Sequence, residues 1–106
     1  RNLYFLYASN NQLSGGLPTS IGYMKNFLAE VDLSGNSLSS TIPEEFGKLE
    51  HITNLRLNGN KLTGTLPEKM GEMESLNELQ IQDNDLTGYV PKKLCNNTGI
   101  SDCGDP

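Results

Sequence analysis

Apolar residues recur along the chain with a period of 24 or 25 residues. Each period is marked by an asparagine that is followed two residues later by leucine and seven residues later by proline. The positions three, five and eight residues before each asparagine are apolar as well. We call each position counted from the asparagine a slot. A repeat of this length is typical of a solenoid, in which one turn buries the apolar face of the next.

Within each period a short alternating run predicts a β-strand, as in Val31-Asp32-Leu33 and Leu55-Arg56-Leu57, with the apolar residues facing the core. Strands of successive turns can then pair in parallel, about 4.8 Å apart. After each proline, segments such as residues 44–49 suit a short 3₁₀ helix, with proline and acidic residues at the start. We therefore expect an α/β solenoid. It is a right-handed superhelix with short parallel strands on its concave side and 3₁₀ or short helical turns on its convex side.

Two irregularities interrupt the repeat. The first interval has one additional residue between Met24 and Leu28, which we expect to bulge outward at a turn without disturbing the core. Ser40 occupies a slot that holds glycine in the other three turns, so we expect the bend there to be strained or mildly altered. The core side of the first turn, around Leu3, Leu6 and Leu13, should need cover from upstream repeats, a cap or a partner chain.

The asparagine slot has a structural explanation. A buried asparagine offers two N–H donors and a carbonyl acceptor, which can satisfy backbone groups in the turn after the strand. Stacked asparagines could also bond one another as a ladder. A role in ligand binding is less favoured, because these side chains should point inward. The four residues are Asn11, Asn36, Asn60 and Asn84.

Residues 1–94 contain about four units, which we interpret as the C-terminal part of a longer array, and residues 95–106 are expected to form a cap. Cys95 falls in a glycine slot and Cys103 in a strand-core slot, so a disulfide between them could close the open end. Two reduced thiols are the main alternative. Asn96 begins an N-glycosylation triplet, although an unmodified loop is equally plausible. Both features favour an extracellular, secreted or lumenal protein.

Composition excludes several functions. With 8 basic and 13 acidic residues the net charge is −5, which disfavours binding to nucleic acid or to an anionic membrane. No apolar stretch is long enough to insert in a membrane. There is one histidine, no metal-ligand spacing and no nucleophile–base set, so we predict no catalytic residues, no metal and no cofactor. Glu30 and Asp32 could resemble a glycosidase pair, but solvated surface charge explains them better.

The outward side chains of the predicted concave sheet form the candidate binding face. Aromatic residues lie at one end, acidic residues in the middle and mixed polar residues at the other end. Aromatic residues and arginine are favoured at interfaces, whereas for the charged and amide residues ordinary solvation is the competing interpretation. These side chains form two rows across the strands, the first being Phe5, Glu30, Asn54 and Glu78 and the second Tyr7, Asp32, Arg56 and Gln80.

The units trace the consensus LxxLxLxxNxLxGxIPxxLGxL, which resembles the plant-type leucine-rich repeat. That repeat is known from receptor-like kinase and receptor-like protein ectodomains and from polygalacturonase-inhibiting proteins. The resemblance implies a non-catalytic module that recognises a protein or peptide. One alternative is a structural subunit wedged into a larger assembly. Another is an inhibitor of a cell-wall polysaccharide hydrolase.

Overall fold

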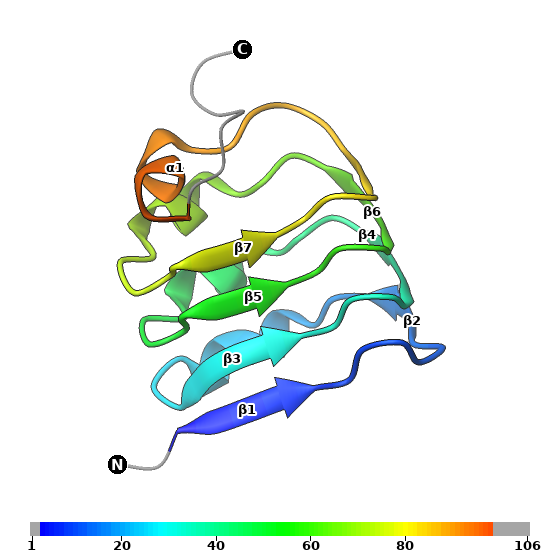
Figure 1. The fold of residues 1–106 in the computed structure, drawn as a ribbon, viewed down its shortest axis with the longest axis horizontal. Coiled ribbons are helices and arrows are strands. Elements are labelled where there is room, and N and C mark those ends of the chain that lie inside the picture. The colour runs from blue at the N-terminus through cyan, green and yellow to red at the C-terminus, as the bar shows by residue number, and fades with distance from the viewer. Residues whose placement is uncertain (1–2, 99–106) are drawn as a thin grey trace.

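The computed structural model describes residues 3–98, and of residues 96–98 it describes the backbone alone. The chain winds into a solenoid of successive turns (Figure 1), and the predicted α/β solenoid is confirmed. Each turn contributes a strand to each of two four-stranded sheets, both with parallel pairing between neighbours. A short helix completes the turn. No helix within residues 3–98 has the length and apolar character needed to cross a membrane.

The first sheet, sheet A, contains the predicted strands. They are β1 (Tyr4–Tyr7), β3 (Leu28–Asp32), β5 (Asn54–Arg56) and β7 (Glu78–Gln80), paired in that order. Val31, Leu55 and Leu79 alternate with polar neighbours and point into the core. The register aligns Val31 with Leu55 and Leu55 with Leu79, so equivalent side chains stack from turn to turn.

The second sheet, sheet B, was not predicted. It consists of β2 (Ser14–Gly16), β4 (Ser37–Ser40), β6 (Lys61–Gly64) and β8 (Asp85–Leu86). Our interpretation of this segment as a bend was therefore incomplete. Leu38 and Leu62 are buried between polar neighbours, which is a strand pattern of minimal length.

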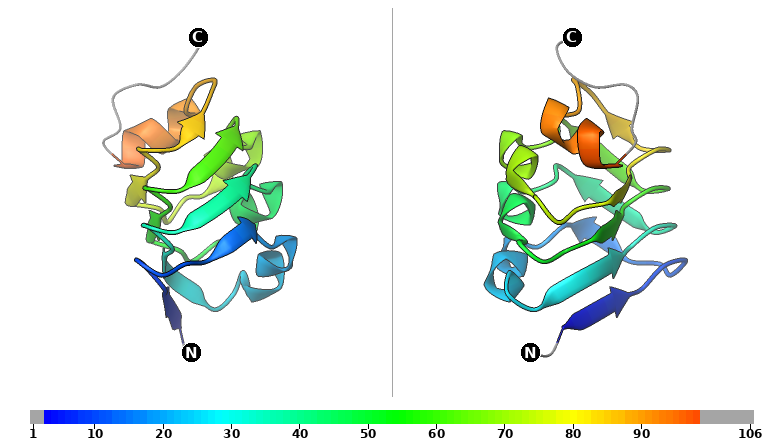
Figure 2. Two further views of the ribbon diagram at one scale, coloured as in Figure 1. Left: turned by 90° about the vertical axis from the view of Figure 1, so that its right-hand side faces the viewer. Right: turned by 60° about the vertical axis from the view of Figure 1, so that its left-hand side comes forward.

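The predicted 3₁₀ helices are present on a separate side of the solenoid, stacked one above another (Figure 2). They are η1 (Thr19–Met24), η2 (Glu44–Lys48) and η3 (Glu68–Glu72), and each follows a proline in extended conformation. Proline suits this position because its fixed φ is compatible with a helix start. The fourth turn instead has an α-helix, α1 (Lys92–Thr98), which still places Leu94 in the core.

The additional residue of the first interval acts at two places. η1 spans 6 residues where η2 spans 5, and a turn at residues 25–27 follows it. The pairing of β1 with β3 also shifts register between Tyr4 and Phe5. Leu28 remains buried, so the core is preserved, but the irregularity is not confined to the turn as we expected. Phe27, at the end of the turn, stacks on Tyr4 with ring centroids 5.8 Å apart.

Ser40 adopts a left-handed conformation with φ 69°, so the strain expected there is present. The neighbouring turns explain why a side chain fits in this slot. A Cβ atom at Gly64, in the same slot one turn later, would lie 2.8 Å from Thr41 Cγ2. Thr41 belongs to the second turn, and the same slot of the first turn, which lies beside Ser40, holds Gly16. A Cβ atom added at Gly16 would be 3.8 Å from Ser40 Cβ. The missing side chain of Gly16 thus leaves room for Ser40.

Candidate binding face

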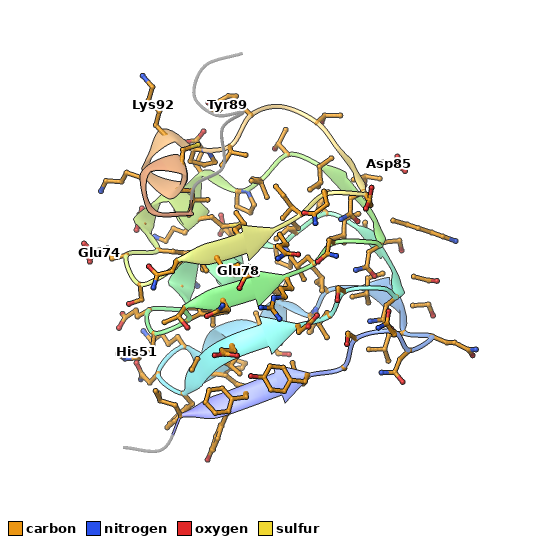
Figure 3. The ribbon with its side chains drawn as sticks, viewed as in Figure 1. His51, Glu74, Glu78, Asp85, Tyr89 and Lys92 are labelled. Atoms are coloured by element: carbon orange, nitrogen blue, oxygen red, sulfur yellow. The ribbon has the colours of Figure 1, made fainter. Side chains whose placement is uncertain are left out.

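The polar side of sheet A presents eight side chains in register across the four strands. Phe5, Glu30, Asn54 and Glu78 form one row, and Tyr7, Asp32, Arg56 and Gln80 form the next. We call these eight residues the sheet A face. One of them, Glu78 on the last strand of sheet A, is labelled in Figure 3. The structure therefore brings together the residues that sequence reasoning assigned to a candidate binding face.

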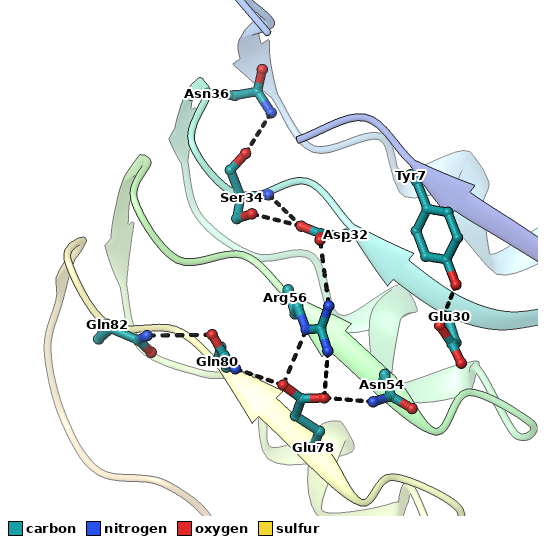
Figure 4. Close-up of polar contacts among 10 residues, drawn as sticks. All are labelled: Tyr7, Glu30, Asp32, Ser34, Asn36, Asn54, Arg56, Glu78, Gln80 and Gln82. Carbon is teal, nitrogen blue, oxygen red and sulfur yellow. Dashed lines mark hydrogen bonds and ion pairs between the residues drawn. The ribbon is translucent and has the colours of Figure 1, made fainter. Parts of the chain in front are cut away.

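An aromatic pair forms one end of the sheet A face. Phe5 and Tyr7 are two residues apart on β1, so both point away from the core. Their rings stack in nearly parallel planes with centroids 6.1 Å apart, and the residues are 58% and 61% exposed. The Tyr7 hydroxyl donates a hydrogen bond to Glu30 Oε1 (Figure 4). This bond raises the pKa of Tyr7 above its usual value, which keeps the phenol protonated.

Arg56 holds the centre of the face. Its Nε and Nη2 donate to Glu78 Oε2 and Oε1 at 3.0 and 2.9 Å, a bidentate arrangement. Nη1 lies 3.6 Å from Asp32 Oδ2 on the other side. The register places Asp32 and Gln80 directly beside Arg56, but its principal partner is the diagonal neighbour Glu78. Sequence reasoning did not identify this pairing.

The surrounding amides and hydroxyls hold the carboxylates in place (Figure 4). Asn54 and Gln80 donate to the two oxygens of Glu78, each at 2.5 Å. Hydrogen bonds from Arg56 and then Asn54 lower the pKa of Glu78 from 4.5 to about 2. Burial opposes ionisation of Asp32, but hydrogen bonds from the hydroxyl and backbone N–H of Ser34 outweigh it and lower the pKa of this carboxyl. The face is therefore an ordered ionic network beside an exposed aromatic pair.

Comparisons with known proteins identify the family of the repeat. A family model described as leucine rich repeat matches residues 26–86, and a second model of that description matches residues 2–24. The chain belongs to the leucine-rich repeat family. No curated protein sequence matches it.

Solved structures similar to this leucine-rich repeat chain include plant receptor proteins. A BIR3–SERK2 complex from Arabidopsis thaliana is 34% identical with a TM-score of 0.82, covering 95% of this chain and 57% of that one. The Arabidopsis receptor kinase HAESA, in complex with the peptide hormone IDA and the co-receptor SERK1, is 32% identical with a TM-score of 0.82, covering 93% and 17%. A plant ice-binding protein is 33% identical with a TM-score of 0.79, covering 90% and 31%. This chain thus spans little more than half of the first matched chain and far less of the others.

The repeated asparagines connect successive turns of the leucine-rich repeat. Asn60 Nδ2 donates to the carbonyls of Leu57 in its own turn and Leu33 in the preceding turn, both at 3.0 Å. Its Oδ1 accepts from the Leu38 N–H at 3.0 Å. Asn36 and Asn84 make equivalent bonds. Within the described residues these side chains bond backbone groups and not one another, so the expected Asn-to-Asn ladder is wrong in that detail.

The remaining candidate positions lie near the end of the chain. Cys95 is half-buried against the core, whereas Cys103 lies outside the described residues. The side chain of Asn96 is also outside them. The disulfide and the glycosylation therefore stay predictions. Residues 3–98 contain no group of three or more His, Cys, Asp or Glu side chains placed to hold a metal ion.

Sheet B carries a second set of polar positions that sequence reasoning overlooked. The residue three positions after each repeated asparagine bears a hydroxyl, and Thr41 and Thr65, which are exposed, add two more. The signal was present in the repeat, but it had no meaning until this segment was known to be a sheet. The four equivalent residues are Ser14, Ser39, Thr63 and Thr87.

Proposed function

We propose that this leucine-rich repeat chain is a non-catalytic recognition module that binds a protein or peptide through the sheet A face. The observation that carries the proposal is the exposed stack of Phe5 and Tyr7 beside the ordered Arg56 network. Aromatic residues and arginine are enriched among the residues that dominate binding energy. A network held by its own hydrogen bonds loses little conformational entropy when a partner binds.

The structural neighbours support this proposal, since the HAESA structure contains a peptide hormone and a co-receptor. By analogy we place the chain in an extracellular or lumenal setting. Within the proposal, residues 1–94 form part of a repeat array and residues 95–106 form its cap, closed by a Cys95–Cys103 disulfide. Glycosylation at Asn96 fits the same setting.

A random peptide library displayed on phage tests the proposal. Peptides selected on the wild-type chain are measured against the Tyr7→Ala/Arg56→Ala variant. Tyr7→Ala removes part of the aromatic pair at one end of the face, and Arg56→Ala dismantles the hydrogen-bonded network at its centre, so binding should weaken by about tenfold or more. The circular dichroism spectrum should be unchanged, because a partly exposed ion pair contributes only about 0–1 kcal/mol to folding.

A matched control removes the same kinds of side chain from another surface. Tyr23 on η1 and Lys48 on η2 are both exposed, so Tyr23→Ala/Lys48→Ala should bind the selected peptides like wild type. Equal binding by wild type and the Tyr7→Ala/Arg56→Ala variant would mean that the sheet A face is idle. The structural-subunit interpretation would then be preferred.

A second candidate function is binding to ice. The observation that favours it is the set of hydroxyls along and just after the strands of sheet B, together with 33% identity to a plant ice-binding protein over 90% of this chain. Hydroxyls that recur from strand to strand can order water molecules, although equivalent hydroxyls here are offset by two residues in the register. Lys61 and Asp85 interrupt the set, because the register pairs them with Ser39 and Thr63.

Coarsening of ice grains in frozen sucrose solution tests this candidate. The wild-type chain should slow the coarsening, and Thr41→Lys/Thr65→Lys should abolish the effect by disrupting the hydroxyl set. Glu44→Lys/Glu68→Lys introduces the same two side chains on exposed positions of η2 and η3 and should behave like wild type. If the wild-type chain slows coarsening no more than serum albumin does, this candidate is wrong.

A further inference from the structure

We infer that the occupant of the sheet A face is an extended peptide carrying a basic residue two positions from a large apolar one. This inference rests on the proposed function and names the class of ligand. Two observations lead to it. Some carboxylates of the face are not neutralised by Arg56, and the aromatic pair lies next to these carboxylates.

The face carries an excess of negative charge. Its three carboxylates, Glu30, Asp32 and Glu78, face a single guanidinium, that of Arg56, which leaves a formal charge of −2 for the eight residues. Glu78 is fully engaged, since each oxygen accepts one bond from Arg56 and one from an amide. The uncompensated charge therefore belongs to Glu30 and Asp32.

Arg56 is poorly placed to receive an acidic ligand. Three of its nitrogens already face carboxylates of this chain, two of them in the bidentate pair with Glu78. An incoming carboxylate would have to break this pair or approach three negative groups. A basic side chain meets the opposite situation at Asp32, whose Oδ2 has only a 3.6 Å ion pair with Arg56 and whose side chain is 17% exposed.

The aromatic pair lies next to these carboxylates. In the register of β1 with β3, Phe5 aligns with Glu30 and Tyr7 with Asp32. Neighbouring strands are about 4.8 Å apart, and same-side residues of an extended peptide are about 7 Å apart. A peptide crossing the strands can thus pack one apolar side chain on the rings while the side chain two residues away reaches Glu30 and Asp32. A guanidinium there also lies close enough to Tyr7 for a cation–π contact.

Two blocked pentapeptides provide the test, Gly-Trp-Ser-Arg-Gly and Gly-Trp-Ser-Glu-Gly. Each is titrated into the ¹⁵N-labelled chain while the backbone amide signals are followed. The arginine peptide should shift signals of β1 and β3 and bind at least about tenfold more tightly than the glutamate peptide. Its affinity should fall as salt is added, because screening weakens exposed charge pairs.

Variants of the chain locate the effect. Glu30→Gln/Asp32→Asn keeps the shapes of both side chains and should weaken the arginine peptide by about tenfold. Glu44→Gln/Glu50→Gln removes the same charge from exposed positions away from sheet A and should retain wild-type affinity. Full retention by Glu30→Gln/Asp32→Asn would overturn the inference.

The outcomes also separate this inference from the proposed function. If the glutamate peptide shifts sheet A signals more strongly, the face recognises peptides but the basic class is wrong. If the arginine peptide shifts no sheet A signal at millimolar concentration, the inference is wrong as well, while the library selection still judges the proposed function. Library peptides enriched in Asp and Glu that require Tyr7 and Arg56 would support the proposed function and contradict the basic class.

Discussion

The first and third turns of the solenoid have the same pattern of residues and very different surroundings. Leu6 on β1 and Leu55 on β5 occupy the same slot, yet Leu6 is 40% exposed and Leu55 is 0% exposed. Leu55 has a strand on each side, β3 and β7, whereas the described structure pairs β1 with β3 alone. In a solenoid the burial of a side chain is therefore set by the turns beside it, and less by its own sequence.

The largest expected difference between these turns concerns the core leucines. Leu55→Ala should lower the free energy of unfolding by about 2–5 kcal/mol, because it creates a cavity among buried side chains. Leu6→Ala removes a side chain that is still partly in water and should cost about 1 kcal/mol. Urea titrations of both variants measure the two values. Equal losses would show that the first turn is covered in solution.

The repeated asparagines should show the same difference between the first and third turns, with smaller losses of unfolding free energy than the leucines. Asn60→Ala leaves the Leu38 N–H and two carbonyls without their buried partner and should cost about 1–3 kcal/mol. Asn11 is exposed and donates to the carbonyls of Ala8 and Ser9, which water can satisfy after Asn11→Ala, so the loss should stay below about 1 kcal/mol. The same titrations provide the values, and a loss for Asn11→Ala as large as that for Asn60→Ala would contradict this explanation.

The glycines four residues after the repeated asparagines test the contact between neighbouring turns. Gly15 and Gly64 share a slot with φ 86° and 79°, so alanine is strained at both by about 1 kcal/mol. Nothing lies within 4 Å of a Cβ atom at Gly15, but one at Gly64 meets Thr41 Cγ2 at 2.8 Å. Gly64→Ala should therefore cost about 1 kcal/mol more than Gly15→Ala.

A double variant checks the source of that excess. In a Thr41→Ala background the methyl group is absent, so Gly64→Ala should cost no more than Gly15→Ala does in the wild-type chain. If the excess persists without the threonine methyl, the contact between the second and third turns is not its cause.

The smallest expected effect on the free energy of unfolding comes from the ion pair between Arg56 and Glu78, in the third and fourth turns. The pKa of Glu78 is lowered from 4.5 to about 2 in the folded chain, so the unfolded chain binds a proton more readily in that range. The stabilisation is present above pH 4.5 and is lost as the pH falls through about 2. Because both side chains of the pair are partly exposed, 39% for Arg56 and 30% for Glu78, solvent screens the interaction and we expect about 1 kcal/mol or less.

Unfolding of wild type and Glu78→Gln at several acidic pH values measures this effect. The wild type should lose its advantage over Glu78→Gln as the pH falls through the range in which Glu78 is protonated. A difference between wild type and Glu78→Gln that is constant with pH would exclude a role for the charge of Glu78.

Much of this fold follows from the repeated slots alone. Period-two alternation around Val31 and Leu55 predicts sheet A, and the prolines predict the starts of the 3₁₀ helices. Sheet B was missed because its strands are two to four residues long and rich in Ser and Gly, so local sequence cannot distinguish them from bends. Pairing with the adjacent turn makes them strands, and that pairing is a property of the stack.

The site shows a similar division. The rows of the sheet A face follow from alternation and period, because these fix which side chains point outward. The choice of Glu78 over Asp32 by Arg56 does not follow from them, since both carboxylates lie on neighbouring strands within reach of a long side chain. Side-chain geometry decides between them, and a repeat pattern contains no information on rotamers.

The fit between Ser40 and Gly16 has a consequence for how such a chain can grow. If the second unit were duplicated in tandem, the new copy of Ser40 would lie next to Thr41 instead of Gly16. Its Cβ would take the place that a Cβ atom at Gly64 would have, 2.8 Å from the threonine methyl. The second unit can thus follow the first but cannot follow itself without a compensating change. Units that share the repeat pattern therefore have a permitted order, because each junction depends on residues of both units that it joins.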